Sequence, residues 1–239
     1  KIIPQSGTTL TVGDSGDTVT LTSGANLSVD GTIKLDGNYP VGTDNVALGD
    51  TALDSVEAGG INNVAIGDHA GTAITTGDNN VAVGKDSLAA NTTASKNTAV
   101  GTSSLATNTT GAGNTAVGFE SLKSNTTGDR NIAVGVESLC SNTTGERNIS
   151  IGYESMCKNT EGSDNTAFGT NSLFSNTTAS NNTALGRSAL FANTTGTNNV
   201  AVGCGALVAN TTAVGNTAVG TVSLASNTTG FNNTAVGNC

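Results

Sequence analysis

The sequence predicts an all-β fold, a parallel β-solenoid (β-roll) built from 17-residue coils. A motif that begins with Asn recurs twelve times between Asn45 and Asn233, and ten of its eleven steps have this one spacing. Gly, Asn and Thr make up 102 of the 239 residues, whereas aromatic residues make up only 3%. The chain has two Pro and 11% charged residues, which is unlike a disordered segment. A regular, non-globular repeat fold accounts for all three observations.

Each copy of the motif begins with a short strand. The recurrent Asn is numbered repeat position 1; position 2 is then β-branched in every copy, and position 4 is always apolar. Position 3 is Ala in eleven copies and Ser150 in the other. This alternation places positions 2 and 4 on one face of a strand and position 3 on the other face. In the stack, the Asn side chains at position 1 are expected to form a hydrogen-bonded ladder.

Two corners complete the coil. Position 5 is Gly in all twelve copies, and Gly adopts positive φ without steric cost. The corner residues singled out are Gly84, Gly101, Gly118, Gly135, Gly152 and Gly169. Gly or Ala at position 15 marks a second corner, so each coil is expected to run strand, corner, short strand, corner. Parallel strands lie about 4.8 Å apart, so eleven steps predict a rod about 50 Å long.

Residues 1–44 lack the repeat and are predicted to form a separate β stem or cap module. Short alternating strands are expected at 8–12, 18–22, 27–29 and 32–35, separated by turns that contain Gly. A cap of this kind protects a solenoid from end-to-end aggregation. The solenoid is then predicted over residues 45–239, with its last copy truncated.

A single stack buries little apolar surface for its length. Each coil offers roughly three large apolar side chains, at positions 2, 4 and 9, worth about 2 kcal/mol each when buried. Ordering each residue costs about 1.5 kcal/mol of conformational entropy. Further burial is therefore expected between chains, with the Ala column at position 3 or the Leu column at position 9 facing a neighbour. A homotrimer around a shared axis is favoured over a self-sufficient monomer.

The residue pattern does not support an enzyme, and no catalytic, cofactor-binding or metal-binding residues are expected. The only His is His69, and no Ser-His-Asp or Cys-His set with a recognisable context surrounds it. The chain has no CxxC pair to indicate zinc, and its acids do not recur at one repeat position as a calcium column requires. Cys140 and Cys157 occupy position 10 of adjacent copies, within disulfide range. They are expected to be either a disulfide or two free thiols.

Position 12 begins an Asn-Thr-Thr sequence in eight copies, which matches the N-glycosylation sequon. The candidate glycosylation sites are Asn91, Asn108, Asn125, Asn142, Asn176, Asn193, Asn210 and Asn227. A secreted eukaryotic chain would carry glycans along one edge, as a glycosylated surface filament. The alternative is that Asn and Thr serve only as turn formers. The Thr columns at positions 13 and 14 make an ice-binding solenoid a further alternative.

Charge and hydropathy exclude two classes of partner. The net charge is −9, and the segment 1–78 carries most of it, with ten acids and two bases. Without a basic stripe, nucleic acid is not an expected partner. No apolar run is long enough for a membrane span. The chain begins with Lys and the array stops within its last copy, so we expect the natural protein to be longer.

The segment Asn62-Asn63-Val64-Ala65-Ile66-Gly67, followed by Ala70 and Gly71, resembles the Asn-Ser-Val-Ala-Ile-Gly repeat of YadA-type trimeric adhesin heads. Those heads are left-handed parallel β-rolls. Arrays of Asn-Thr-Ala-Val-Gly, Ser-Leu and Asn-Thr-Thr-Gly also resemble tail-fibre proteins of marine bacteriophages and other viruses. The resemblance covers residues 45–239, although the 17-residue period is longer than the adhesin repeat.

This resemblance implies an extracellular structural fibre segment at a virion or cell surface, serving host or surface attachment. Its implied partners are two further copies of itself in a homotrimer, and a host or cell-surface receptor, glycans included. That receptor would bind a part of the fibre outside these residues.

Overall fold

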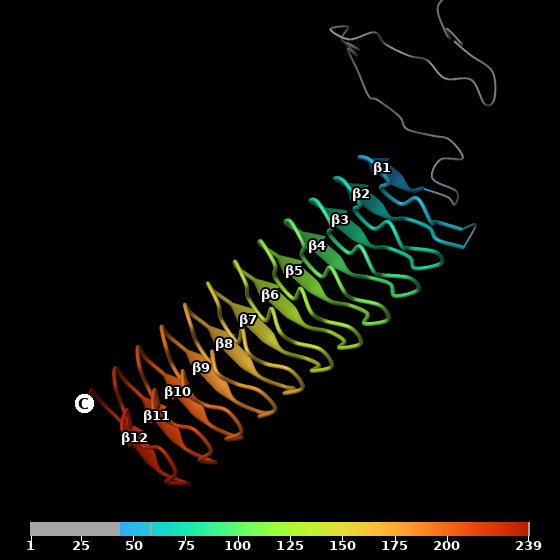
Figure 1. Ribbon diagram of the computed structural model, residues 1–239. Coiled ribbons are helices and arrows are strands. Elements are labelled where there is room, and N and C mark those ends of the chain that lie inside the picture. The colour runs from blue at the N-terminus through green and yellow to red at the C-terminus, as the bar shows by residue number, and fades with distance from the viewer. Residues whose placement is uncertain (1–43, 58, 239) are drawn as a thin grey trace, which may run out of the picture. The chain divides into compact units, whose positions relative to one another are not determined.

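In the computed structural model, which describes residues 44–57 and 59–238, the chain is a β-solenoid of stacked coils (Figure 1). Twelve strands form one parallel sheet, and each pairs with the strands immediately before and after it in sequence. The strands are β1 (Val46–Leu48), β2 (Val64–Ile66), β3 (Val81–Val83), β4 (Thr98–Val100), β5 (Thr115–Val117), β6 (Ile132–Val134), β7 (Ile149–Ile151), β8 (Thr166–Phe168), β9 (Thr183–Leu185), β10 (Val200–Val202), β11 (Thr217–Val219) and β12 (Thr234–Val236). The strands expected within the stem module lie outside the described residues.

The strand register follows the sequence repeat. Thr98 pairs with Thr115, and Ala99 pairs with Ala116 in the same ladder. The single 18-residue step does not disturb this register, since Val46 still pairs with Val64. Residues at the same repeat position therefore lie above one another in columns, and the predicted parallel solenoid is confirmed.

The rest of each coil consists of turns, and the expected second strand does not form in the described residues. Non-Gly residues at positions 7 and 9 adopt left-handed backbone angles, such as Glu120 with φ 53° and Leu122 with φ 50°. Such angles lie outside the β region, so these residues cannot continue a strand. Their amides nevertheless bond to neighbouring coils: Leu122 N donates to the Ser138 carbonyl at 3.0 Å, and Glu120 N donates to the Thr102 carbonyl at 3.0 Å.

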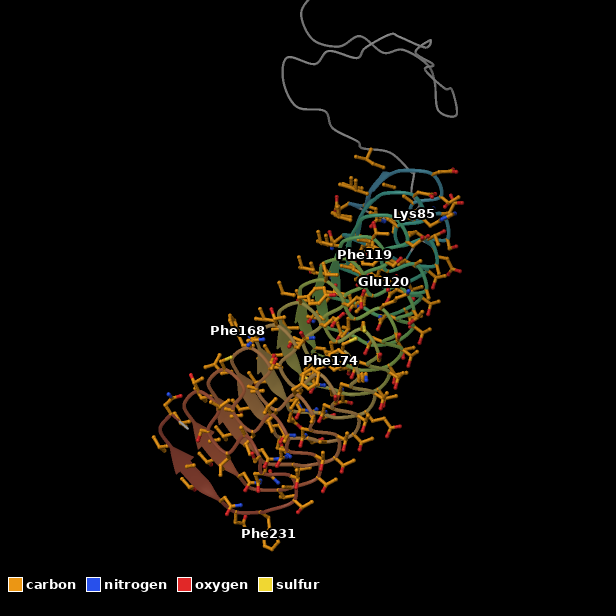
Figure 2. The ribbon with its side chains drawn as sticks, turned by 60° about the vertical axis from the view of Figure 1, so that its left-hand side comes forward. Lys85, Phe119, Glu120, Phe168, Phe174 and Phe231 are labelled. Carbon is orange, nitrogen blue, oxygen red and sulfur yellow. The ribbon has the colours of Figure 1, made fainter. Side chains whose placement is uncertain are left out.

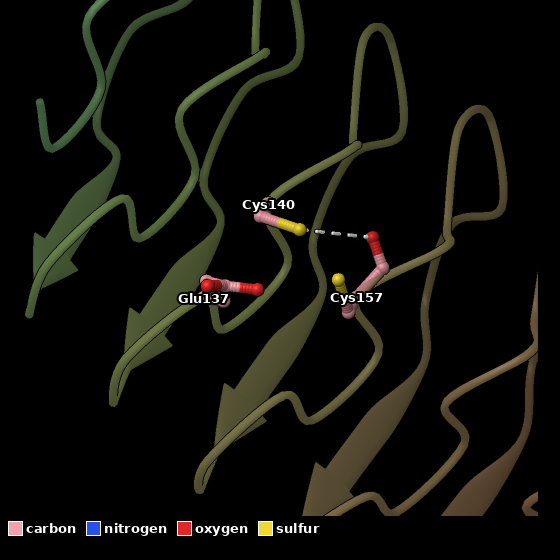
Figure 3. A group of neighbouring side chains, drawn as sticks. All are labelled: Glu137, Cys140 and Cys157. Carbon is pink, nitrogen blue, oxygen red and sulfur yellow. Dashed lines mark hydrogen bonds between the residues drawn. The ribbon is translucent and has the colours of Figure 1, made fainter.

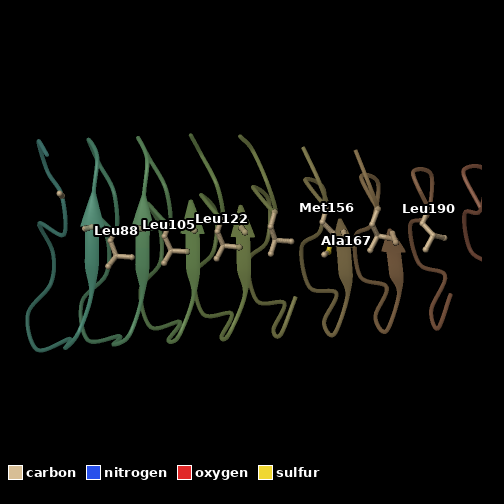
Figure 4. Packing of buried hydrophobic residues seen from close by; sticks show 14 of the residues in the cluster. Leu88, Leu105, Leu122, Met156, Ala167 and Leu190 are labelled. Atoms are coloured by element: carbon tan, nitrogen blue, oxygen red, sulfur yellow. The ribbon is translucent and has the colours of Figure 1, made fainter. Parts of the chain in front are cut away.

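The hydrophobic core combines the Ala column at position 3 with the Leu or Met column at position 9. Ala116 and Leu122 are fully buried, and the equivalent residues of successive coils pack in one continuous cluster (Figure 4). This corrects the expectation that one of these columns faces a neighbouring chain. Positions 2 and 4 point outward instead. The Leu side chains occupy the narrow interior, and each strand contributes only a small side chain to it, Ala in most coils and Ser150 in β7.

Two columns of buried Asn form a polar layer beside this core. At position 1, Asn114 N donates to Asn97 Oδ1 at 2.9 Å, and Asn114 Nδ2 donates to the Gly128 carbonyl at 2.8 Å. At position 12, Asn125 Nδ2 donates to Asn108 Oδ1 at 2.8 Å and to the same Gly128 carbonyl at 2.9 Å. Both amides thus bind the position-15 carbonyl of their own coil, which closes the coil while each also bonds along the stack.

The Gly at position 5 is required by backbone angle and by spacing. Gly135 has φ 132°, a value that L side chains rarely adopt. A Cβ added at Gly135 would lie 2.5 Å from the carbonyl oxygen of Gly152 in the next coil. The six corner Gly residues singled out from the sequence share these angles, with φ between 126° and 136°.

Candidate functional site

One candidate interaction surface is the outward face of the strands, here called the apolar sheet face. It comprises positions 2 and 4 of β1–β12, which hold only Val, Thr, Ile, Leu and Phe. Leu48, Phe168 and Leu185 are 45–50% exposed on it, and Phe168 projects from the stack in Figure 2. A row of exposed apolar side chains along successive strands is typical of an interaction site. The absence of charge along the whole face is typical of the buried centre of a protein interface.

The sequon Asn residues are structural. Seven of the eight are fully buried, namely Asn91, Asn108, Asn125, Asn142, Asn176, Asn193 and Asn210. Asn227, in the last complete coil, is half-buried. The glycan-accepting nitrogen is already engaged: Asn176 Nδ2 donates to Asn159 Oδ1 at 2.6 Å and to the Ala179 carbonyl at 2.9 Å. The folded array therefore has no room for glycans at the seven buried positions, which weighs against a glycosylated filament.

The Thr columns do not form the double array that an ice-binding face would use. At position 13, Thr126 Oγ1 donates to the Thr143 carbonyl of the next coil at 3.0 Å, so its hydroxyl belongs to the inter-coil ladder. Position 14 is exposed, as at Thr127 and Thr144, but Glu161 interrupts that column. One interrupted hydroxyl column is left, which gives the ice-binding alternative no support.

The two stacked cysteines lie in one small side-chain cluster. Cys140 and Cys157 are half-buried free thiols in adjacent coils, and Cys140 Sγ donates to the Cys157 carbonyl at 3.4 Å. The carboxylate of Glu137 faces them (Figure 3), and the three ligand atoms all lie within 4.8 Å of one another. Cys204, at position 6, is not stacked on another cysteine of the described residues.

The two thiols differ in acidity because they share a hydrogen bond. Donation from the Cys157 thiol stabilises the Cys140 thiolate and lowers the pKa of Cys140 to about 7, although burial opposes this shift. The same hydrogen bond, together with burial, raises the pKa of Cys157. Cys140 is therefore the nucleophilic thiol of the pair near neutral pH.

The remaining polar clusters are surface ion pairs. His69 Nδ1 lies 3.2 Å from Asp86 Oδ1, and Lys85 Nζ lies 3.1 Å from Asp68 Oδ2. These side chains are about half exposed, so such pairs contribute little to stability. The cluster has no nucleophile beside His69. A hollow lined by residues 222–227 and 235–238 is the uncovered end of the core at the last coil.

Glu137 is the residue that sequence reasoning missed. A search for CxxC pairs cannot find it, because one of its partners lies in its own coil and the other lies in the next coil. The stacking of coils brings them together. The same pair of repeat positions, 7 and 10, already meets one coil earlier, where Lys123 Nζ lies 2.8 Å from Glu120 Oε1.

In the part of the chain that the structure describes, no helix is long and apolar enough to span a bilayer. Comparison of the chain with protein-family models, with curated proteins and with solved structures finds no match in any of the three. Function is therefore inferred from the repeat geometry and from the motif resemblance.

Proposed function

We propose that this chain is a structural segment of an extracellular fibre, the shaft or head of an attachment device of the viral tail-fibre or trimeric-adhesin type. The observation that carries the proposal is the uninterrupted parallel stack from β1 to β12 in a single register. A scaffold of this kind spans distance by adding one short coil at each step. Its role is mechanical, and a host or cell-surface receptor, glycans included, would bind another part of the fibre.

The internal bonding suits that mechanical role. Main-chain hydrogen bonds tie every coil to the next. From the coil that begins at Asn80 to the coil that begins at Asn216, the two Asn ladders and the column of Leu or Met at position 9 add further ties. Among the described residues, Thr51 Oγ1 is the only buried side-chain nitrogen or oxygen without a hydrogen-bond partner. A polar core that is satisfied to this degree stabilises one arrangement over others.

The apolar sheet face is the surface through which copies of the chain would associate. A second and a third copy present the same uncharged strip, so three strips can meet along a common axis without burying a charge. We infer three copies from the motif resemblance to trimeric fibres. We infer that they associate through this face from its lack of charge. The proposal assigns the chain no catalytic activity.

Charged substitutions on the face test the association. Ile132→Lys with Ile149→Lys places two ammonium groups at outward positions that are each 38% exposed. Thr127→Lys with Thr144→Lys adds the same charge at the exposed position-14 column and serves as the matched control. By sedimentation equilibrium, we expect the parent and the control to be trimers, and the Ile132/Ile149 variant to be a monomer with an unchanged circular dichroism spectrum.

The outcomes separate the parts of the proposal. A trimer that survives the Ile132/Ile149 pair would rule out the apolar sheet face as the interface. A parent dimer would preserve the face and refute the trimer. A parent monomer would refute self-association altogether. Electron microscopy of the native particle would then check whether rods project from a virion or cell surface, as a fibre segment requires.

A further inference from the structure

The group formed by Glu137, Cys140 and Cys157 has the composition of a soft-metal site. It combines two thiols and one carboxylate, and all three are half-buried at the surface of two adjacent coils. Thiolate sulfur and carboxylate oxygen are both ligands of Zn²⁺. Figure 3 shows the carboxylate of Glu137 directed toward the two sulfur atoms.

The equivalent carboxylates of the two neighbouring coils have polar partners other than thiols, unlike the carboxylate of Glu137. In the same column, Glu120 is paired with Lys123 at 2.8 Å, and Glu154 accepts a hydrogen bond from Asn171 Nδ2 at 2.9 Å. The amide of Glu137 donates to the Phe119 carbonyl at 2.9 Å, whereas its carboxylate makes no hydrogen bond or ion pair to any described residue. Two thiolates and a carboxylate here carry three negative charges, which a divalent cation would largely neutralise.

The separations are close to those that coordination needs. Tetrahedral Zn²⁺ with bonds of about 2.3 Å to sulfur and about 2.1 Å to oxygen holds its ligands about 3.5–3.8 Å apart. The three ligand atoms already lie within 4.8 Å of one another. Side-chain rotations that move each atom by about 1 Å would complete the geometry. The coil backbone need not move, because the ladder fixes the Cα positions.

We propose that the reduced Cys140 and Cys157 thiols, together with the Glu137 carboxylate, bind one thiophilic divalent cation, with solvent in the remaining coordination position. Binding releases the thiol protons to solvent and forms two metal–sulfur bonds and one metal–oxygen bond. No electron is transferred. The cation links two successive coils at mid-array.

A cadmium titration tests the site. The full chain is reduced with a phosphine, shown to carry four reactive thiols per denatured chain, and titrated with Cd²⁺ under anaerobic conditions. The thiolate-to-cadmium charge-transfer absorption reports binding. The variants are Cys140→Ser, Cys157→Ser and Glu137→Gln, and Cys204→Ser is the matched control that removes an unstacked thiol.

We expect one Cd²⁺ per chain, an unchanged affinity in Cys204→Ser, and loss of the high-affinity absorption in either stacked-cysteine variant. Glu137→Gln should weaken binding by about tenfold or more, because removing groups that merely support a ligand already costs about 10- to 100-fold. Zn²⁺ should likewise slow alkylation of Cys140 and leave Cys204 unaffected. These residues are only partly buried, so circular dichroism should show the fold intact in every variant.

Three results would overturn the proposal. One is a parent affinity no greater than that of the Cys140→Ser variant. Another is a Glu137→Gln variant that binds Cd²⁺ as tightly as the parent, which would remove the carboxylate from the site. The third is equal weakening by Cys204→Ser, which would show that any thiol suffices.

Discussion

Replacing Asn125 by Ala removes one rung from the position-12 ladder. Three hydrogen bonds disappear: those donated by Asn125 Nδ2 to Asn108 Oδ1 at 2.8 Å and to the Gly128 carbonyl at 2.9 Å, and the one that Asn125 Oδ1 accepts from Asn142 Nδ2 at 2.9 Å. The side chain is fully buried, so water cannot replace these bonds without entering the core.

The expected cost follows from which partners are left unpaired. The Gly128 carbonyl keeps the bond from Asn114 Nδ2 at 2.8 Å, and Asn142 Nδ2 keeps its bond to its own coil at 3.0 Å. Oδ1 of Asn108 loses its donor and stays buried. Three bonds worth about 1 kcal/mol each, with one orphaned acceptor worth about 1–2 kcal/mol, predict that the free energy of unfolding falls by about 4–5 kcal/mol.

Urea unfolding of unglycosylated protein, followed by circular dichroism, measures this loss. The matched control is Thr127→Ala, which abolishes the same sequon from an exposed position and leaves the ladder untouched. It should change the free energy of unfolding by less than about 0.5 kcal/mol. An Asn125→Ala variant as stable as the control would refute the structural role of the ladder. In a glycosylating host, an equal effect of the two substitutions would instead indicate a glycan.

Three further predictions concern the Gly column at position 5, the Leu column at position 9 and the stacked cysteines at position 10. Gly135→Val should destabilise the array by at least about 2 kcal/mol, because a φ of 132° and the carbonyl of the next coil exclude a side chain. The same unfolding assay measures this loss, and unchanged stability would show the corner assignment to be wrong. Leu122→Ala should cost about 2–5 kcal/mol as a buried cavity, and a negligible cost would mean that the Leu column faces outward. Cys140 should be alkylated faster than Cys157 at pH 7, with a rate that rises through a pKa of about 7. Cys157→Ala should move that midpoint upward, because the thiolate loses its donor, and an unmoved midpoint would contradict the shared hydrogen bond.

The sequence period was sufficient to predict the fold and its register. Twelve Asn residues and twelve Gly residues recur with a spacing of 17 in ten of eleven steps, which indicates coils of nearly equal length. The pairing of Thr98 with Thr115 follows directly from that spacing. The number of copies that associate is a separate question, since nothing in a repeat period determines it.

The direction of the strand faces was not predictable from the same pattern. Alternation shows that Val117 and Ala116 lie on opposite faces, but it does not say which face is inside. Hydrophobicity favoured the larger residue, whereas the structure buries Ala116 and leaves Val117 36% exposed. The Leu at position 9 fills most of the narrow interior, so only a small residue of the strand fits beside it. That Leu adopts a left-handed backbone angle, for which a non-Gly residue gives no sequence signal.

The candidate metal site illustrates a similar limit. The stacking of Cys140 on Cys157 could be read from their shared repeat position in adjacent copies. The approach of Glu137 could not, because it depends on the path of the turn between positions 7 and 10. Once that path is known, the Glu120–Lys123 ion pair shows that long side chains at these two positions can meet.

The distance between equivalent residues of different coils tests the central claim most directly. Thr127 and Thr212 are exposed position-14 residues five coils apart, so stacking predicts a separation of about 24 Å although the two are distant in sequence. Double electron–electron resonance spectroscopy measures this distance between spin labels at the two positions. The labelled chain carries no other cysteine and is diluted with unlabelled copies. Moving the second label to Thr229 should add about 4.8 Å. Separations that do not grow by one constant step per coil would contradict the solenoid.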